Sequence, residues 1–452
     1  MLTRRQFNQG FVAMAFGGLA THLHGGELTR YLTDVASGSN SLGGLVPDPK
    51  GIIDLPPGFS YRAISQLGEV MNDGLTVPDR ADGMGCFMVD EERVVLVRNH
   101  ELSPSNGTTG QARTSVDSAA VYDTDSSGNP LPGGTSNIVY NLKTHQVEYQ
   151  CMSLLGTIRN CSGGITPWGS WLTCEESVAT ASAKINKNHG YVFEVPSQAR
   201  QLVKPDPIKA MGRFNHEAAC VDPISGIVYL TEDRPDSLFY RYIPNQKGDL
   251  KAGGQLQALV VRGESKFDTR NWQESRMQVN QPYACEWIDL DNVDSPDDDL
   301  RIRGFAKGAA LFARGEGIHF GTDEMYFCCT SGGKAKLGQI MRYKPSPKQD
   351  QQTGTLTLFV ESLDKVTFNF GDNITVAPSG HLIVCEDQYS DTVNNHLKGV
   401  TPSGKVYDVA KVRWQTEPAG ACFSDDGSVL FVNLYSPTTT LAISGPWASL
   451  NA

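Results

Sequence analysis

Six short segments of the chain share one pattern of apolar and polar positions. In each, a turn or a charged residue precedes three to five apolar, β-forming residues, and a polar or acidic residue follows. The segments span residues 92–97, 169–174, 226–231, 324–329, 380–385 and 427–432. Short apolar runs bounded by turn residues are typical of buried strands. The pattern therefore predicts six similar strands at uneven spacing.

A second element recurs upstream of most of these strands. A polar residue is followed by small residues in segments 214–219, 313–317, 369–374 and 417–420, with weaker copies at 82–85 and 161–164. Small residues suit strands that crowd together around an axis, so we expect these segments to be innermost strands. The repeated unit predicts an all-β fold, a six-bladed β-propeller with irregular insertions. Acidic residues at the strand ends are then expected to converge at the mouth of a central channel.

The first residues suggest an export signal. Paired arginines in residues 3–7 precede the weakly apolar run 10–20, as in twin-arginine leaders. We expect a signal peptide at 1–24, an N-terminal arm at 25–50 and one propeller domain at 51–448. These features predict use of the twin-arginine export machinery and a periplasmic or secreted protein without a stable membrane span.

Charge narrows the class of partner. The net charge of -11 argues against a nucleic-acid partner, because phosphate backbones require clustered Lys and Arg. An acidic surface fits cation binding or ordinary solubility. The run 289–299 contains six aspartates, and we interpret it as a solvated acidic turn in preference to a calcium loop.

Carboxylates gathered at one mouth need protonation or bound cations to offset their repulsion. Ca2+ takes six to eight oxygen ligands, and acids at the strand ends suit it. The candidates from strand ends and innermost strands are Glu101, Glu232, Asp372, Asn373, Glu386 and Asp387.

Two residues suggest that the channel mouth could bind a transition metal or an anionic substrate in addition to Ca2+. Cys174 precedes Glu175 and Glu176 at a strand end, where a thiolate could bind a transition metal or could simply be buried. Arg314 lies two residues from Glu316, so it could bind an anionic substrate in fork geometry or form a structural salt bridge. None of the ten cysteines forms a CxxC pair, and their pairing is not assigned.

At these residues the sequence resembles the PhoX family of bacterial alkaline phosphatases. The resemblance rests on segments 96–101, 166–176, 212–217, 313–317 and 385–387, together with the leader. It implies a propeller with Fe3+ and Ca2+ in the channel mouth. It also implies that Cys174 binds iron, that Glu217 and Glu316 bind metal, and that Arg314 contacts phosphate. The residues implied as calcium ligands are Glu175, Glu232, Asp372, Glu386 and Asp387.

The predicted function is that of a periplasmic, metal-dependent alkaline phosphatase acting on small phosphomonoesters. Metal ions would replace a catalytic triad, since the chain has no Gly-x-Ser-x-Gly motif. One alternative is a calcium-dependent lactonase or phosphotriesterase on a propeller. Another is a non-catalytic propeller stiffened by calcium.

Overall fold

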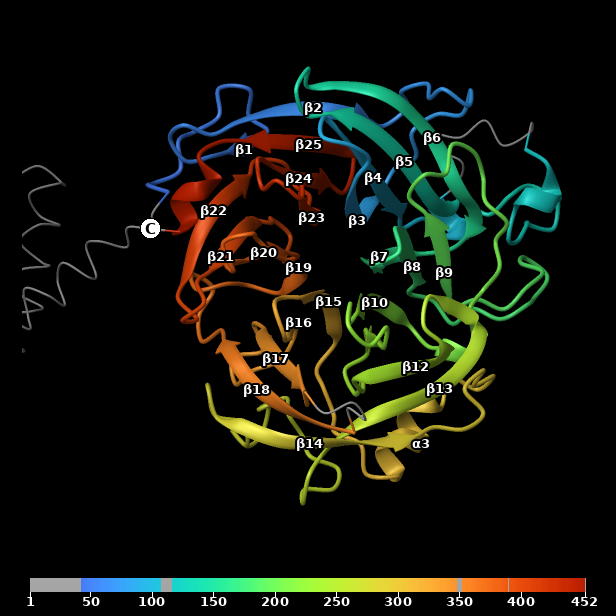
Figure 1. Ribbon diagram of the computed structural model, residues 1–452, viewed down its shortest axis with the longest axis vertical. Coiled ribbons are helices and arrows are strands. Elements are labelled where there is room, and N and C mark those ends of the chain that lie inside the picture. The colour runs from blue at the N-terminus through green and yellow to red at the C-terminus, as the bar shows by residue number, and fades with distance from the viewer. Residues whose placement is uncertain (1–41, 107–115, 348–351, 389, 452) are drawn as a thin grey trace, which may run out of the picture.

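The computed structural model describes residues 42–106, 116–347, 352–388 and 390–451. The predicted signal peptide at 1–24 lies outside these residues. In the part of the chain that is described, no helix is both long enough and apolar enough to cross a membrane. The strands are arranged radially around a central opening, which gives an all-β, propeller-like molecule (Figure 1).

Three of the five sheets are separate antiparallel meanders or nearly so. The first contains β3 (Ala81–Met88), β4 (Arg93–His100), β5 (Gly133–Asn141) and β6 (Gln146–Thr157). The second contains β7 (Asn160–Ile165), β8 (Ser170–Glu175) and β9 (Val192–Pro196). The third contains β19 (Gly371–Val376), β20 (Leu382–Glu386), β21 (His396–Val400), β22 (Val406–Val412) and the short β1 (Ile53–Asp54).

The fourth sheet joins the beginning of the described chain to its end. The strands β23 (Pro418–Phe423), β24 (Val429–Leu434) and β25 (Thr439–Ser444) form a meander, and β2 (Ser60–Gln66) pairs antiparallel with β25. This pairing closes the ring of sheets through backbone hydrogen bonds.

The fifth sheet has nine strands and contains two meanders. One contains β10 (His216–Val221), β11 (Val228–Glu232), β12 (Tyr240–Gln246) and β13 (Asp249–Val261). The other contains β15 (Gly315–Phe320), β16 (Met325–Cys329), β17 (Gln339–Pro345) and β18 (Thr353–Glu361). The strand β14 (Pro282–Asp289) pairs with both β13 and β18 and so joins the outer edges of the two meanders.

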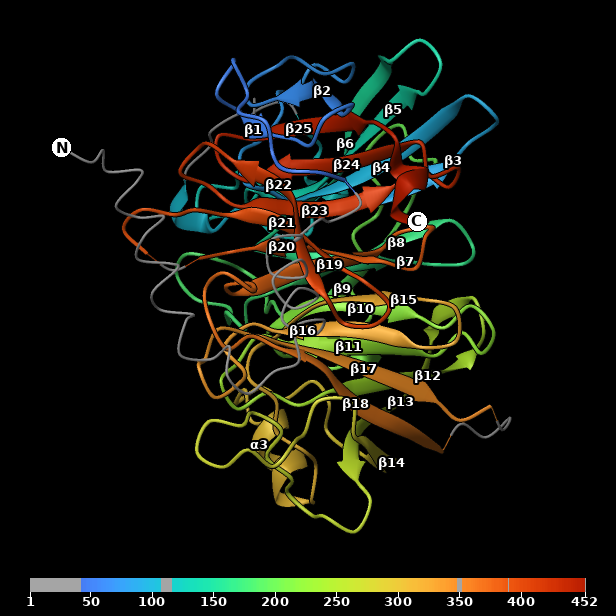
Figure 2. The same ribbon diagram turned by 90° about the vertical axis from the view of Figure 1, so that its left-hand side faces the viewer.

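The helices are few and short. α3 (Leu300–Ala306) follows β14, and Figure 2 shows both at the end of the molecule opposite β2. The 3-10 turns are η1 (Pro104–Asn106), η3 (Ser118–Ala120), η4 (Lys209–Met211) and η5 (Trp447–Asn451). Before α3, Asp299 and Asp291 form ion pairs with Arg303, which agrees with a solvated acidic turn.

The six apolar runs seen in the sequence are all second strands of their meanders: β4, β8, β11, β16, β20 and β24. Each is almost fully buried along its length, because neighbouring sheets cover both of its faces. A strand buried on both faces reads as a continuous apolar run and not as an alternating one. This explains why the runs were visible in the sequence.

Six strands surround the axis, and each packs against the next until β23 meets β3: β3, β7, β10, β15, β19 and β23. They are the small-residue segments of the sequence. At Gly164 an added Cβ would lie 1.9 Å from the carbonyl oxygen of Ala219 on the neighbouring strand. Only glycine fits there, so crowding at the axis explains the small residues.

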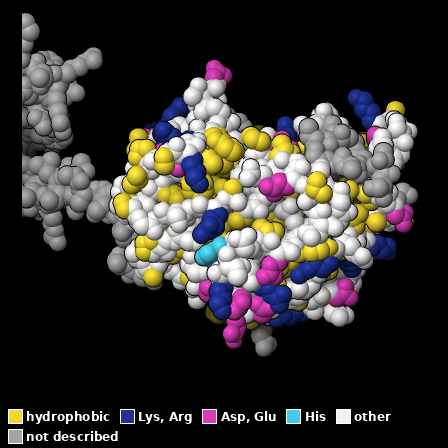
Figure 3. All heavy atoms as spheres, turned by 90° about the horizontal axis from the view of Figure 1, so that it is seen from above, with side chains coloured by type: hydrophobic (Ala, Val, Ile, Leu, Met, Phe, Trp, Pro, Cys, Tyr) yellow, Lys and Arg dark blue, Asp and Glu magenta, His cyan; other side chains and the backbone are white. Residues whose placement is uncertain are grey.

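On the rim of the molecule, acidic and basic side chains are interspersed, and this face has no broad basic patch (Figure 3). Further acidic groups are buried inside the molecule, where the innermost strands begin.

Candidate metal and phosphate site

One backbone hydrogen bond recurs beside every innermost strand. The carbonyl oxygen of the residue before that strand accepts from the N–H of the residue after the second strand, at 2.8–3.2 Å. The acceptor–donor pairs are Arg80–Glu101, Arg159–Glu176, Asn215–Asp233, Arg314–Thr330, Phe370–Asp387 and Glu417–Tyr435. These bonds bring the beginning of each innermost strand and the end of its partner to the same place. Side chains at both positions therefore gather around the axis.

The second residue of each innermost strand is the next contributor. These residues are Asp82, Cys161, Glu217, Glu316, Asp372 and Ala419, so five of the six carry an acidic group or a thiol. The pairing register shifts at five of these positions and directly after the sixth, Ala419. Such bulges are typical of places where a strand redirects a side chain.

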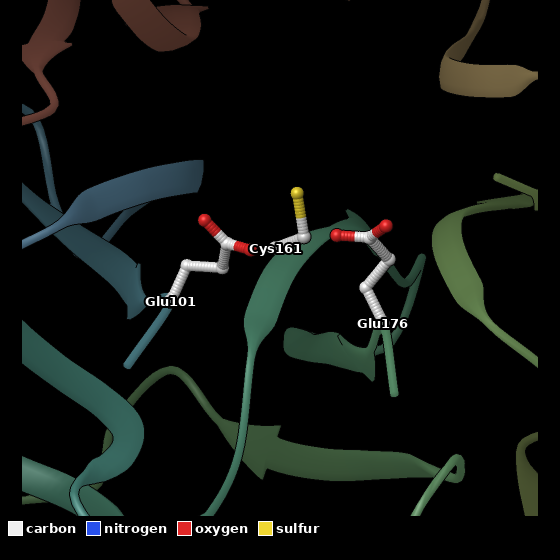
Figure 4. Close-up of side chains that lie close together, drawn as sticks. All are labelled: Glu101, Cys161 and Glu176. Carbon is white, nitrogen blue, oxygen red and sulfur yellow. The ribbon is translucent and has the colours of Figure 1, made fainter. Parts of the chain in front are cut away.

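Together these residues form what we term the axial group. It consists of nine carboxyl groups and one thiol: Asp82, Glu101, Glu176, Glu217, Asp233, Glu316, Asp372, Asp387, Glu417 and Cys161. Within it, three sets of ligand atoms lie within 4.8 Å of one another. The sets are Glu101–Cys161–Glu176, Glu217–Glu316–Asp372 and Asp372–Asp387–Glu417. Figure 4 shows the first set, in which the two carboxyl groups flank the sulfur.

The structure separates the two acids of each strand-end pair. Glu176, Asp233 and Asp387 belong to the axial group, whereas the preceding residues Glu175, Glu232 and Glu386 do not. Successive residues on a strand point to opposite faces, so only one acid of a pair can face the axis.

The acids that lie outside the axial group accept hydrogen bonds from nearby loops. Glu175 accepts hydrogen bonds from the N–H groups of Gly190 and Ile158, at 2.9 and 3.1 Å, and contacts the ring of His189 at 2.6 Å. These contacts fix the loop between β8 and β9.

Glu232 and Glu386 have the same role in their own meanders. Glu232 accepts from the hydroxyl of Tyr240 at 2.7 Å, and burial raises its pKa to about 7. Glu386 accepts from the N–H groups of Asn369 and His396 at 2.8 and 2.9 Å. Of the acids proposed from the sequence as calcium ligands, these three lie outside the axial group.

Cys174 also lies apart from the axial group. Its side chain is fully buried among apolar residues that include Leu172, Val192 and Phe214, and burial raises the pKa of its thiol. The thiol that reaches the carboxyl groups is that of Cys161, whose Sγ lies 3.5 Å from Oδ2 of Asp82. The structure therefore replaces Cys174 with Cys161 as the candidate sulfur ligand.

The other acidic candidates from the sequence come together as expected. Glu101, Glu217, Glu316, Asp372 and Asp387 all belong to the axial group. Arg314 contacts it directly: its Nε donates to Asp233 at 2.6 Å, and its Nη2 donates to Glu316 at 3.1 Å.

Sequence reasoning missed five members of the axial group: Asp82, Cys161, Glu176, Asp233 and Glu417. A usable signal existed for two of them. Asp82 and Cys161 begin the weaker copies of the small-residue segment, at the position that Glu217 and Glu316 occupy in the stronger copies. For Glu176 and Asp233 the sequence offered two adjacent acids and no means of choosing between them.

The electrostatics of the axial group are those of crowded, desolvated acids. Burial and the neighbouring charges of Glu176 and Asp372 raise the pKa of Glu217 well above its usual value. Burial and the charge of Asp387 raise the pKa of Asp372 to about 7. Burial likewise raises the pKa values of Glu316 and Glu417. Such groups either hold protons or share cations.

The residues fit a metal site. Both carboxylate oxygens of Glu217 and Oδ1 of Asp82 are buried without a hydrogen-bond partner, and a buried acceptor of this kind needs a proton or a cation. Two of the three sets offer only oxygen atoms, which suits hard cations such as Ca2+. The third adds a sulfur atom, which suits a transition metal.

A cavity lies along the axis on the far side of the acids. Its volume is about 490 Å3, and its walls come from the innermost strands beyond their first residues, including Gly163, Ile318 and Ile374. These walls are mostly apolar, so the charged chemistry is confined to the end of the axis where the strands begin.

The fold and the site define a class: a propeller-like protein with a buried cluster of carboxyl groups that could hold metal ions and with arginines at its edge. The chain matches the family described as Alkaline phosphatase PhoX over residues 41–131 and 124–438, and it belongs to this family. It is accordingly a metal-dependent alkaline phosphatase, a phosphomonoester hydrolase.

The fold is shared with one solved structure. Pseudomonas fluorescens PhoX in complex with vanadate, a transition state analogue, is 18% identical with a TM-score of 0.68, covering 90% of this chain and 98% of that one. A gluconolactonase from Xanthomonas campestris is 12% identical, with a TM-score of 0.43 and coverage of 90% and 99%. No curated protein matches the chain.

Proposed function

We propose that the axial group holds calcium and iron, and that these ions form the phosphatase centre. The oxygen-only sets around Asp372 would hold Ca2+, and the set containing Cys161 would hold Fe3+. Bound there, the ions would supply Lewis-acid activation of the phosphoryl group. The observation that carries this proposal is the pair of buried, unpartnered oxygen atoms of Glu217 amid nine carboxyl groups and one thiol.

Arg314 is proposed as a phosphate-binding residue. Its guanidinium holds Asp233 and Glu316 at once and is partly open to solvent, so a substrate oxygen can approach it. A planar fork of N–H donors matches a phosphoryl group and stabilises the charge that it gathers during transfer.

Purified protein tests this function directly. We expect iron and calcium by elemental analysis, hydrolysis of p-nitrophenyl phosphate, and loss of that activity on chelation with recovery on adding Ca2+. Protein that lacks iron and hydrolyses lactones but not phosphomonoesters would instead support the lactonase alternative.

The finer architecture and location belong to the same proposal. Counting each meander of the nine-stranded sheet separately gives six blades in one domain at 51–448. The leader at 1–24 would direct twin-arginine export to the periplasm. Changing Arg4 and Arg5 to lysine should leave active enzyme in the cytoplasmic fraction; export of the variant would contradict the leader.

A further inference from the structure

Arg159 occupies the same place in its meander as Arg314 does in its own. Each is the residue immediately before an innermost strand, β7 and β15 respectively. Each adopts a left-handed backbone conformation, with φ of 47° and 54°. This conformation is uncommon for residues other than glycine. Arg80 and Phe370 adopt it at the same position before β3 and β19, so the conformation belongs to this point of the meander and starts the side chains of Arg159 and Arg314 from equivalent places.

The contacts of the two arginines are also alike. Arg159 donates from Nε to Glu101 at 2.8 Å and from Nη2 to Glu176, just as Arg314 spans Asp233 and Glu316. Its side chain is 39% exposed, against 22% for Arg314, so both guanidinium groups lie at the open edge of the axial group.

The two arginines are linked to each other. Only β10 separates β7 from β15 around the axis, and the negative charge of Asp233 is close enough to Glu176 to raise the pKa of that carboxyl, after burial. Arg159 pairs with Glu176 and Arg314 pairs with Asp233, so the two guanidinium groups are held by neighbouring carboxyl groups of the axial group. Two forks held in this way could bind one tetrahedral anion between them.

We infer that Arg159 is a second phosphate-binding arginine, which acts with Arg314 on the same phosphoryl group. This inference rests on the proposed metal centre. Glu101 and Glu176, the present partners of Arg159, are also proposed cation ligands. Cation binding would offset their negative charge and leave the guanidinium donors free for an anion.

Arg80 provides a matched control. It also precedes an innermost strand, with φ of 54°, but its guanidinium donates to the hydroxyl of Tyr435 at 2.9 Å and packs over that ring. No ion pair between Arg80 and the axial group is present in the described part of the chain. It shares the backbone setting of Arg159 without the proposed role.

The experiment uses metal-loaded enzyme and inorganic phosphate as the probe. The variants Arg159→Asn, Arg314→Asn and Arg80→Asn are compared, because asparagine tolerates the left-handed conformation. Phosphate affinity is measured by calorimetry, and metal content is measured on the same samples. We expect Arg159→Asn and Arg314→Asn each to weaken phosphate binding about tenfold or more, the effect of losing charge-assisted hydrogen bonds. Arg80→Asn should change it less than about threefold.

The further variant Arg159→Lys should recover only part of the affinity, since a point charge replaces the fork. Unchanged phosphate affinity in Arg159→Asn would overturn the inference, and so would loss of metal in that variant, because the residue would then position carboxylates. If Arg314→Asn weakens binding and Arg159→Asn does not, this inference alone fails. If the wild type neither binds nor hydrolyses phosphate compounds, the proposed function fails as well.

Discussion

At the scale of single residues, the direction of a side chain at a strand end decides its role. Glu175 and Glu176 are adjacent and chemically identical, yet one fixes a loop and the other reaches the axial group. The sequence predicted acids at this place but could not choose between them, because a shift of one residue reverses every side chain on a strand. The same ambiguity affected Glu232 with Asp233 and Glu386 with Asp387.

The two cysteines of this region give the sharpest test at this scale. Cys161→Ser should lower iron content and any visible absorption of the pure protein, because a hydroxyl is a poor substitute for a thiolate ligand. Cys174→Ser should retain iron, since that thiol lies in an apolar core; it should cost stability, by about 1–3 kcal/mol for a buried hydroxyl without a partner. Elemental analysis and urea unfolding of both variants measure the two effects. Iron loss in Cys174→Ser alone would reverse the assignment.

At the scale of elements, the innermost strands are recognisable by their small residues, because neighbouring strands leave no room for larger side chains. Segments 82–85 and 161–164 looked like weak copies of the repeat, yet they form β3 and β7 and contribute Asp82 and Cys161. Their small residues were informative because neighbouring strands leave no room for a Cβ. The bulges that aim the second residue at the axis had no sequence signal, since they depend on the pairing with the next strand.

Adding one methyl group to an innermost strand should therefore be costly. Gly164→Ala would place a Cβ 1.9 Å from the carbonyl oxygen of Ala219, so β7 and β10 must move apart. We expect destabilisation of about 3 kcal/mol or more, at the upper end for overpacking. The control is Gly44→Ala, where the new methyl group meets nothing within 4 Å. Urea unfolding midpoints compare the two, and equal midpoints would contradict crowding at the axis.

At the scale of the whole molecule, the sequence predicted the repeated meanders but not how their edges join. The strand β14 corresponds to none of the segments predicted from the sequence, and its pairing with β13 and β18 depends on tertiary contact. The ring closes where β2 pairs with β25, which brings distant parts of the chain into one sheet. This closed ring is what holds acids from different sheets together despite their mutual repulsion.

That repulsion predicts how the stability of metal-free protein depends on pH. The pKa of Asp372 is about 7 in the folded protein against an ordinary value of 3.8, and that of Glu232 is also raised to about 7. Between pH 4 and 7 the folded state then binds more protons than the unfolded state, so the free energy of unfolding falls as the pH rises. Chelated protein should be more stable at pH 5 than at pH 8 by an amount on the order of a few kcal/mol.

Adding Ca2+ at pH 8 should restore stability, because cation binding favours the charged carboxylates of the folded state. Chemical unfolding at both pH values, with and without Ca2+, measures this dependence. Greater stability of the chelated protein at pH 8 than at pH 5 would contradict the prediction, because the axial group would then carry its charge without cations.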